Sequence, residues 1–455
     1  MHFRHDIGAI GRLAWPNLLG FGTQLLMVAV DGAVAARLGA SELAAIALIL
    51  PIQMLLIQTA HGAFGAATAG NVARAVGARD MTAARNVAAH ALSVALIVSV
   101  GLAIIGWTFS AQILHAAGGQ GRILELAASY LVVLFATGIP IWLNGALIGI
   151  ARGAKMMWLP TFSMGATAIV HVGVAPALSL GWFGLPALGL QGLAWSYLLC
   201  YTLLLAPLGY ILVRERLLAR VFPETWDMGL LRLMRQTAGM AVIASALNNL
   251  SVMLSTRLVS AYGPETLAGY GLAARLEYAI APLVFSVGTA LIVLCGQARG
   301  AGDMALARRY AITGVSVATV VVGILGAAIT IEPDLWLRWF AAPPAVAQEG
   351  RDYLRVTAFS YAFLGAGLTA FFASQAFGDM LRPMFGAVFR IVIILIGSAI
   401  AGAWFSAETW PLYIVFAVAF VVYGTNNILA VLHLAKDDRA TPAAGPPEPA
   451  ELARR

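Results

Sequence analysis

Two acidic residues, Asp31 and Glu277, lie deep inside long apolar stretches of the sequence. The first stretch, IGAIGRLAWPNLLGFGTQLLMVAVDGAVAA, runs from residue 7 to residue 36 and is long enough to cross a bilayer. A carboxylate inside a membrane span is costly unless a partner or water reaches it, so it marks a functional site by default. The alternative is that Asp31 ends the span and merely caps it. We expect Asp31 to carry a coupling ion.

Two neighbours of these acids bear on their roles. Pro16 lies in the same stretch as Asp31 and removes a backbone donor, which predicts a kink and a hinge in the first helix. Glu277 belongs to the segment AARLEYAIAP, two residues after Arg275. Residues two apart point to different sides of a helix, so these two need not pair. Glu277 either joins helices through an ion pair or takes part in ion coupling.

Other polar and aromatic residues of the apolar stretches could bind a proton or a substrate. His171 lies in TFSMGATAIVHVGVAPAL, and an imidazole titrates close to neutral pH, so it could carry a proton or simply bond to a neighbouring helix. Asn144 and Arg275 are polar candidates for a substrate cavity, although amides in spans more often join helices. Trp195 and Tyr278 could line a cavity for flat or cationic compounds.

The composition is that of a polytopic membrane protein. Of 455 residues, 60% are hydrophobic and 11% charged, and the mean hydropathy is +0.85, whereas soluble domains carry about 25% charged residues. Cys200 and Cys295 both lie in apolar segments, which favours buried thiols over a disulfide. We expect an all-α protein with twelve spans, at about 8–36, 43–70, 84–108, 123–149, 157–179, 187–213, 231–260, 266–297, 306–331, 352–376, 383–405 and 410–434.

The basic residues predict the orientation of these spans. Most of the 28 Lys and Arg residues lie on the side of the N-terminus, which by the positive-inside rule places both termini in the cytoplasm and the protein in the cytoplasmic membrane. This bias accounts for the net charge of +7 without any nucleic-acid partner. Only Arg275 is expected deep within a span.

The chain repeats itself. GARDMTAAR at 77–85 returns as GAGDMALAR at 300–308, and LGASELAAIAL at 38–48 returns as YGPETLAGYGL at 262–272. A repeat over six spans predicts two pseudo-symmetric six-helix lobes with the binding site between them. We expect an N-terminal lobe at 1–213, a basic cytoplasmic linker at 214–230, a C-terminal lobe at 231–435 and a disordered Pro-rich tail at 436–455.

These segments together resemble the multidrug and toxic compound extrusion (MATE) transporters. The resemblance rests on Pro16 and the VD at 30–31 followed by ARLGASELAA, on NVARAVGARD, on GIARGAKMMWLP, and on GLAARLEYAIAP with GQARGAGD. It implies a V-shaped pair of six-helix lobes, alternating access, and export driven by inward H⁺ or Na⁺. In the bacterial branch of DNA-damage-inducible exporters the first-span Asp is the ion-coupling acid and the first helix bends near the Pro. Those residues would be Asp31 and Pro16.

The sequence departs from that branch at the fifth span, where an Asn and an acid are usual and this chain has His171 and Ala175. The seventh-span acid of the other bacterial branch is also replaced, within SALNNLSVML. The family arrangement implies that His171 faces Asp31, and that Ser196, in GLAWSY, matches a hydroxyl near the cation site. Hard cations prefer oxygen ligands, so imidazole and alanine here favour H⁺ over Na⁺.

The sequence therefore predicts a secondary antiporter that exports an amphiphilic or cationic organic compound and acts as a monomer in the bilayer. A Na⁺-coupled exporter is one alternative. Another is a flippase for lipid-linked precursors, which would need many basic residues in its cavity where only Arg275 is expected. An enzyme is not expected, because the sequence has no Walker loop, GxSxG, HExxH or paired-Asp motif. No cofactor or metal is expected.

Overall fold

The structure is a computed structural model that describes residues 2–116, 120–340, 343–404 and 408–434. These residues form helices and no strands, and twelve helical segments among them are long and apolar enough to cross a membrane. The all-α fold with twelve spans is therefore confirmed. The tail predicted to be disordered, 436–455, lies outside the described residues.

Six spans make up the first lobe. Its second span is continuous from residue 41 to residue 77, longer than the predicted 43–70, and contains a π-helical turn, η1. The elements of the lobe are α1 (His2–Leu38), α2 (Ala40–Gln58), η1 (Thr59–Phe64), α3 (Gly65–Gly77), α4 (Met81–Ala116), α5 (Gly121–Gly153), α6 (Trp158–Leu180), η2 (Trp182–Gly184) and α7 (Gln191–Arg214).

The other six spans make up the second lobe. The seventh span joins α8, η3 and α9, and the tenth joins α13, η5 and α14. The elements are α8 (Met228–Met234), η3 (Arg235–Gly239), α9 (Met240–Ser260), α10 (Pro264–Gly300), α11 (Met304–Ile331), α12 (Asp334–Leu337), η4 (Arg338–Phe340), α13 (Pro344–Thr357), η5 (Ala358–Ser360), α14 (Tyr361–Phe377), α15 (Leu381–Trp404) and α16 (Trp410–Leu434).

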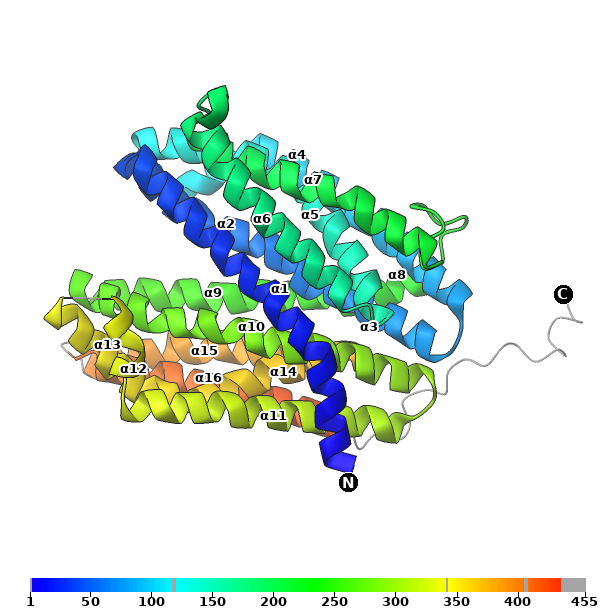
Figure 1. Ribbon diagram of the computed structural model, residues 1–455. Coiled ribbons are helices and arrows are strands. Elements are labelled where there is room, and N and C mark those ends of the chain that lie inside the picture. Colours follow the sequence, from blue (N-terminus) through cyan, green and yellow to red (C-terminus); the bar gives the residue numbers. More distant parts are fainter. Residues whose placement is uncertain (1, 117–119, 341–342, 405–407, 435–455) are drawn as a thin grey trace, which may run out of the picture.

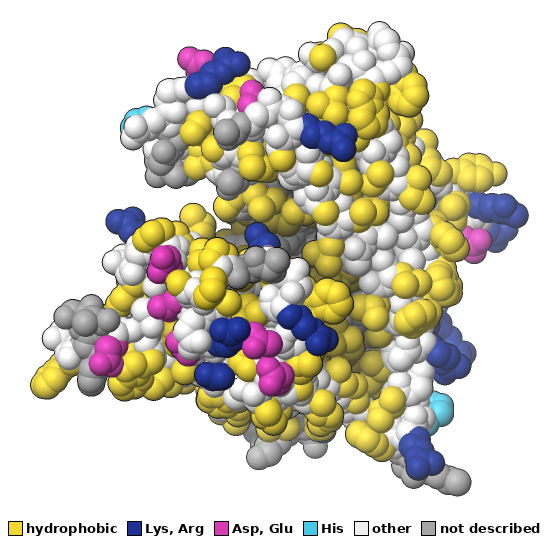
Figure 2. Space-filling model, turned by 60° about the vertical axis from the view of Figure 1, so that its left-hand side comes forward, with side chains coloured by type: hydrophobic (Ala, Val, Ile, Leu, Met, Phe, Trp, Pro, Cys, Tyr) yellow, Lys and Arg dark blue, Asp and Glu magenta, His cyan; other side chains and the backbone are white. Residues whose placement is uncertain are grey.

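The two lobes form a V (Figure 1). They approach each other at the end that carries the turns at 78–80 and 301–303 and the segment 215–227, here called the linker end. They diverge at the opposite end, here called the cleft end, where α1 meets α2 and α9 meets α10. Figure 2 shows a hollow between the lobes at the cleft end, with hydrophobic side chains around it and some Lys or Arg side chains at its edge. A compound in the cleft would therefore meet largely apolar walls with basic groups at the edge.

Contacts between the lobes close the linker end. The Gln297 side-chain amide on α10 donates to the Gly153 carbonyl at 3.2 Å. The backbones of α3 and α10 touch, because a Cβ on Gly77 would meet the backbone of Gln297 and one on Gly300 would meet that of Arg74. Small residues allow helices to approach this closely within a membrane. The structure is thus open at one end only.

The first helix belongs to both lobes. Its start packs on the second lobe, where Ala9, Ile10 and Ala14 share an apolar cluster with α10, α11 and α14. Its remainder packs on α6 and α2 of the first lobe. Figure 1 shows α1 changing direction in its N-terminal half, and the helix contains Pro16. Proline leaves an unpaired carbonyl one turn earlier and bends the helix, so the predicted kink is present.

The linker between the lobes is shorter than the predicted 214–230. Arg214 ends α7 and Met228 already begins α8, because the Asp227 carboxylate accepts hydrogen bonds from the Gly229 and Leu230 amides at 2.8 and 3.1 Å. The intervening residues 215–227 run along α4. His90 on that helix accepts a hydrogen bond from the Asp227 amide at 3.0 Å. The linker is therefore anchored to the first lobe.

Candidate functional site

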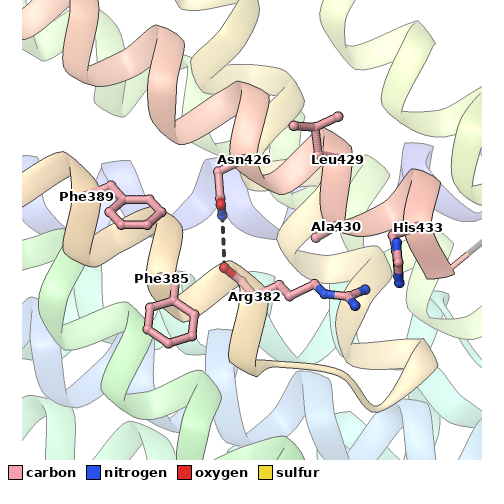
Figure 3. Close-up of a pocket in the computed structure, with 7 residues that line it drawn as sticks. All are labelled: Arg382, Phe385, Phe389, Asn426, Leu429, Ala430 and His433. Atoms are coloured by element: carbon pink, nitrogen blue, oxygen red, sulfur yellow. Dashed lines mark hydrogen bonds between the residues drawn. The ribbon is translucent and has the colours of Figure 1, made fainter.

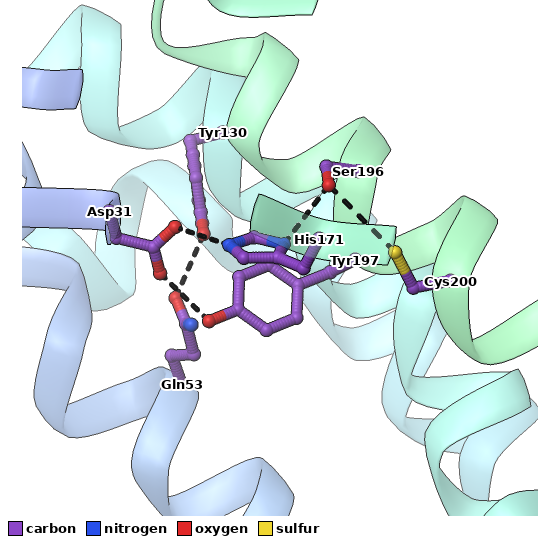
Figure 4. Close-up of polar contacts among 7 residues, drawn as sticks. All are labelled: Asp31, Gln53, Tyr130, His171, Ser196, Tyr197 and Cys200. Atoms are coloured by element: carbon purple, nitrogen blue, oxygen red, sulfur yellow. Dashed lines mark hydrogen bonds and ion pairs between the residues drawn. The ribbon is translucent and has the colours of Figure 1, made fainter. Parts of the chain in front are cut away.

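The Asp31 carboxylate lies inside the first lobe and is hydrogen-bonded through both oxygens (Figure 4). Its Oδ1 is 2.9 Å from Nε2 of His171 on α6, and its Oδ2 accepts a hydrogen bond of 2.8 Å from the Tyr197 hydroxyl on α7. Asp31 is 3% exposed and His171 is fully buried. The alternative that Asp31 merely caps the end of α1 is wrong, since the helix continues to Leu38.

Ser196 extends this cluster. Its hydroxyl lies 3.0 Å from Nδ1 of His171, and the residue is fully buried. With Asp31 ionised, Nε2–H of His171 donates to the carboxylate and the Ser196 hydroxyl donates to Nδ1. A proton that arrives here meets two groups that can accept it, the carboxylate and the imidazole, whose Oδ1 and Nε2 atoms lie 2.9 Å apart. The geometry therefore suits the reversible binding of a proton.

A second polar pair lies beside the carboxylate, where the Tyr130 hydroxyl donates to Oε1 of Gln53 at 2.8 Å (Figure 4). The two copies of the internal repeat begin at residues 77 and 300. The same spacing along the chain separates Tyr130 from Tyr353, and a spacing one residue longer separates Gln53 from Glu277. The Tyr353 hydroxyl donates to Oε1 of Glu277 at 2.8 Å. The internal repeat has thus kept one hydrogen bond in both lobes, with an amide in the first and a carboxylate in the second.

Glu277 does not contact Arg275. Its Oε1 accepts a further hydrogen bond of 3.4 Å from the Tyr361 hydroxyl, and the guanidinium of Arg390 on α15 is a nearby positive charge that forms no ion pair with it within the described part of the chain. The guanidinium of Arg275 lies instead over the Phe340 ring, 5.7 Å from its centre. Glu277 is therefore part of a polar cluster inside the second lobe, and Asp31 belongs to a separate cluster in the first.

The residues expected to line a substrate cavity are not brought together. Asn144 and Ser196 are buried inside the first lobe, Ser196 against His171. Trp195 and Tyr278 are 43% and 51% exposed, on α7 and α10, and Arg275 is also exposed. These five side chains therefore do not form one binding pocket in this open conformation.

Arg275 lies within the span Pro264–Gly300, as expected, but its side chain is exposed and it is not the only basic residue within a span. Arg152 and Arg390, which the sequence places near the ends of spans, are 1% and 6% exposed. The Arg152 guanidinium donates to Oδ1 of Asn17 at 3.3 Å and lies over the Phe21 ring. Arg390 lies over Phe420, 4.7 Å from the ring centre. Aromatic and amide partners allow both cations to be buried.

Tyr197, Gln53 and Tyr130 were not singled out by the sequence. Each is one of several polar or aromatic residues in an apolar span, and which of them meet depends on helix rotation and packing. The internal repeat was a usable signal, because it relates Tyr130 to Tyr353 and Gln53 to the intramembrane acid Glu277.

A surface groove lies between α15 and α16 towards the linker end (Figure 3). It is lined by Phe385, Phe389 and Leu429, with Arg382 and His433 at its rim. It contains none of the predicted site residues and lies on the second lobe alone. It is therefore separate from the Asp31 cluster.

Comparison with known proteins agrees with this arrangement. A probable multidrug resistance protein of Bacillus subtilis, YoeA, is 24% identical over 79% of this chain and 78% of its own length. A FAD transporter of Shewanella oneidensis is 24% identical over 89% of this chain and 91% of its own. The crystal structure of the Vibrio cholerae MATE transporter VcmN superposes with a TM-score of 0.88 at 18% identity, covering 96% of this chain and 98% of that one.

The family model named MatE matches residues 16–177 and 241–400, one stretch in each lobe. The two stretches together span well over half of the chain and include Pro16, Asp31, His171, Glu277 and Arg390. Its members are transporters and not enzymes. The chain belongs to the MatE family of membrane transporters.

Proposed function

We propose that this chain is a secondary active antiporter that exports amphiphilic or cationic organic compounds across the cytoplasmic membrane in exchange for inward H⁺. Both termini lie in the cytoplasm, so the cleft end faces outward and the structure represents the outward-open state of an alternating-access cycle. The protein acts as a monomer. The observation that carries the proposal is the buried Asp31 carboxylate, hydrogen-bonded to His171 and Tyr197.

The surroundings of Asp31 favour a proton over Na⁺. Sodium is a hard cation that prefers several oxygen ligands. One carboxylate oxygen faces the imidazole of His171, a nitrogen group, and the other accepts the Tyr197 hydrogen bond. Ala175, one turn further along α6, is fully buried and offers no side-chain ligand. A cation would have to displace both partners, whereas a proton can join the existing hydrogen bonds.

The walls of the cleft support an amphiphilic substrate. Figure 2 shows hydrophobic side chains around the hollow, with some Lys or Arg side chains at its edge. A flippase for a pyrophosphate-linked lipid would need a strongly basic cavity. The buried Arg152 and Arg390 do not supply one, because their partners are Asn17, Phe21 and Phe420 inside the lobes. Export of a dedicated metabolite is a second candidate, since a similar protein is described as a FAD transporter.

The proposal is tested in a bacterial host that lacks its own efflux pumps. Cells expressing this protein should export ethidium, a flat cationic dye, and the variant Asp31→Asn should bind ethidium but fail to export it against a gradient. The matched control is Glu125→Gln, the same charge loss at an exposed carboxylate. Measuring released FAD in the same cells decides between the two substrate classes. Export by Asp31→Asn at the wild-type rate would contradict the proposal.

A further inference from the structure

A small internal cavity lies in the first lobe between α1, η1, α5, α6 and α7. Its polar lining consists of Gln24, His61, Asn144, Thr167 and Tyr201. All of these except Gln24 are buried, at 4% exposure or less, and Gln24 is half-buried. The cavity has room for about one water molecule.

The cavity lies one helical turn from the Asp31 cluster, on the side of the linker end. Thr167 precedes His171 by four residues on α6, and α6 runs from the linker end to the cleft end. Tyr201 follows Tyr197 by four residues on α7, which runs in the opposite direction. One turn is about 5.4 Å. Helices α6 and α7, which carry the Asp31 partners His171 and Tyr197, therefore also line this cavity.

The cavity contains polar groups without partners. Neither ring nitrogen of His61 has a hydrogen-bond partner of ordinary geometry among the described residues. The backbone of Ile141 lies near the ring, but not in good hydrogen-bond geometry. The side-chain nitrogen of Asn144 is also unpartnered there. The π-helical turn η1 carries His61, and such turns are frequent at functional sites. Buried polar groups of this kind bind water when the space allows.

The two sides of the cavity differ. Met164 also lines the cavity, and its sulfur lies 3.8 Å from Nη2 of Arg152. A guanidinium therefore lies next to the cavity on the side of the linker end. Its positive charge opposes a cation on that side. Gln24, two turns from Asp31 along α1, is half-buried and forms the partly exposed edge of the cavity. The titratable groups around His61 are thus Arg152 and Tyr201, with the His171–Asp31 pair one turn away.

We propose that this cavity binds water and that His61 with this water relays the proton between Asp31 and the Gln24 edge. A neutral imidazole can accept a hydrogen bond at one nitrogen and donate at the other, so one ring can pass a proton between two neighbours. Arg152 prevents the same route from leaking towards the linker end. The relay rests on the proposed proton coupling, whereas the water site does not.

The water site is tested by X-ray hydroxyl-radical footprinting of the purified protein, because radicals formed from bound water label the side chains around it. Met27 and Met164 line the cavity although both are buried. Both should be oxidised several-fold more than Met380, which is 1% exposed in the second lobe. The variant His61→Leu should abolish the excess. Equal oxidation of Met27, Met164 and Met380 in the wild type would overturn the proposal.

The relay is tested by stopped-flow detection, with a pH-indicator dye, of the proton released when ethidium binds. His61→Leu should slow release about tenfold at unchanged ethidium affinity, because a hydrogen-bonded step is lost. His61→Gln should restore part of the rate, and His115→Leu, at an exposed histidine, should change nothing. An unchanged rate in His61→Leu would overturn the relay. Absence of any release from the wild type would overturn the proton coupling as well, while footprinting would still decide the water site.

Discussion

Arg309 on α11 donates two hydrogen bonds to the Asp6 carboxylate at the start of α1, at 2.7 and 3.1 Å. Asp6 is fully buried although it lies only a few residues from the chain's beginning. This bidentate ion pair joins the first helix to the second lobe. Bidentate pairs of this type are strong and geometrically specific, so the pair anchors the start of α1 on the second lobe at the linker end.

The variant Asp6→Asn should therefore favour opening of the linker end. An amide can meet only one of the two guanidinium donors and carries no charge. Spin labels placed at Asp80 and Asp303, in the turns of the two lobes, should show a longer distance in Asp6→Asn than in the same labelled protein without it. The control is Glu125→Gln, because this exposed carboxylate pairs with the exposed Arg122 on the same helix, α5. An unchanged distance distribution would contradict this role.

His171→Asn should change the pH profile of transport, because the ring nitrogen 2.9 Å from the Asp31 carboxylate is lost. An asparagine still occupies the site between Asp31 and Ser196, but its amide does not bind a proton at physiological pH. The measurement is ethidium export over a series of pH values, with His115→Asn as the control at an exposed histidine. An unmoved profile would show that Asp31 acts without His171.

Glu277→Gln should lower stability more than transport. Glutamine keeps an acceptor for the Tyr353 and Tyr361 hydroxyls but removes a negative charge that acts on the buried Arg390. Loss of this compensating charge costs on the order of 1–3 kcal/mol. Thermal unfolding of the purified protein should show a lower midpoint, which the double variant with Arg390→Met should raise again. Full loss of export at unchanged stability would instead assign Glu277 a direct role in ion coupling.

Pro16→Ala should slow the transport cycle without lowering expression. The alanine restores the missing backbone donor, and a straighter α1 would resist bending between the lobes. The Pro16 carbonyl, which accepts a hydrogen bond of 2.7 Å from Thr161, remains available to the variant. Export per molecule is compared with that of Pro51→Ala, another proline within a helix. Equal rates for Pro16→Ala and the wild type would argue against a hinge.

Hydropathy and the internal repeat were sufficient to predict the twelve spans and the two lobes, because each span must satisfy its own backbone in the bilayer. The meeting of Asp31 with His171 was anticipated through the family resemblance. The burial of Arg152 was missed, since window counting places it at the end of a span. Its partners Asn17 and Phe21 come from another helix, and such pairings depend on helix rotation, which hydropathy does not record.

The π-helical turn around His61 could not be predicted for a related reason. The second span reads as one uniform apolar segment, and the extra residue of a π turn leaves no mark on its hydropathy. The π-helical turn packs directly against α5 at Gly145. A Cβ on Gly145 would meet the Ala60 carbonyl and the His61 ring, so a glycine is needed for this close approach. These close contacts decide the position of the cavity and appear only when the helices are packed.

The central claim is that a proton bound at Asp31 drives export, and the most direct measurement uses purified protein in proteoliposomes. A pH gradient and a Na⁺ gradient are imposed separately while ethidium transport is followed. The account predicts transport driven by the pH gradient alone, lost in Asp31→Asn and retained in Glu125→Gln. Transport driven by the Na⁺ gradient alone, with no pH gradient and a protonophore present, would contradict it.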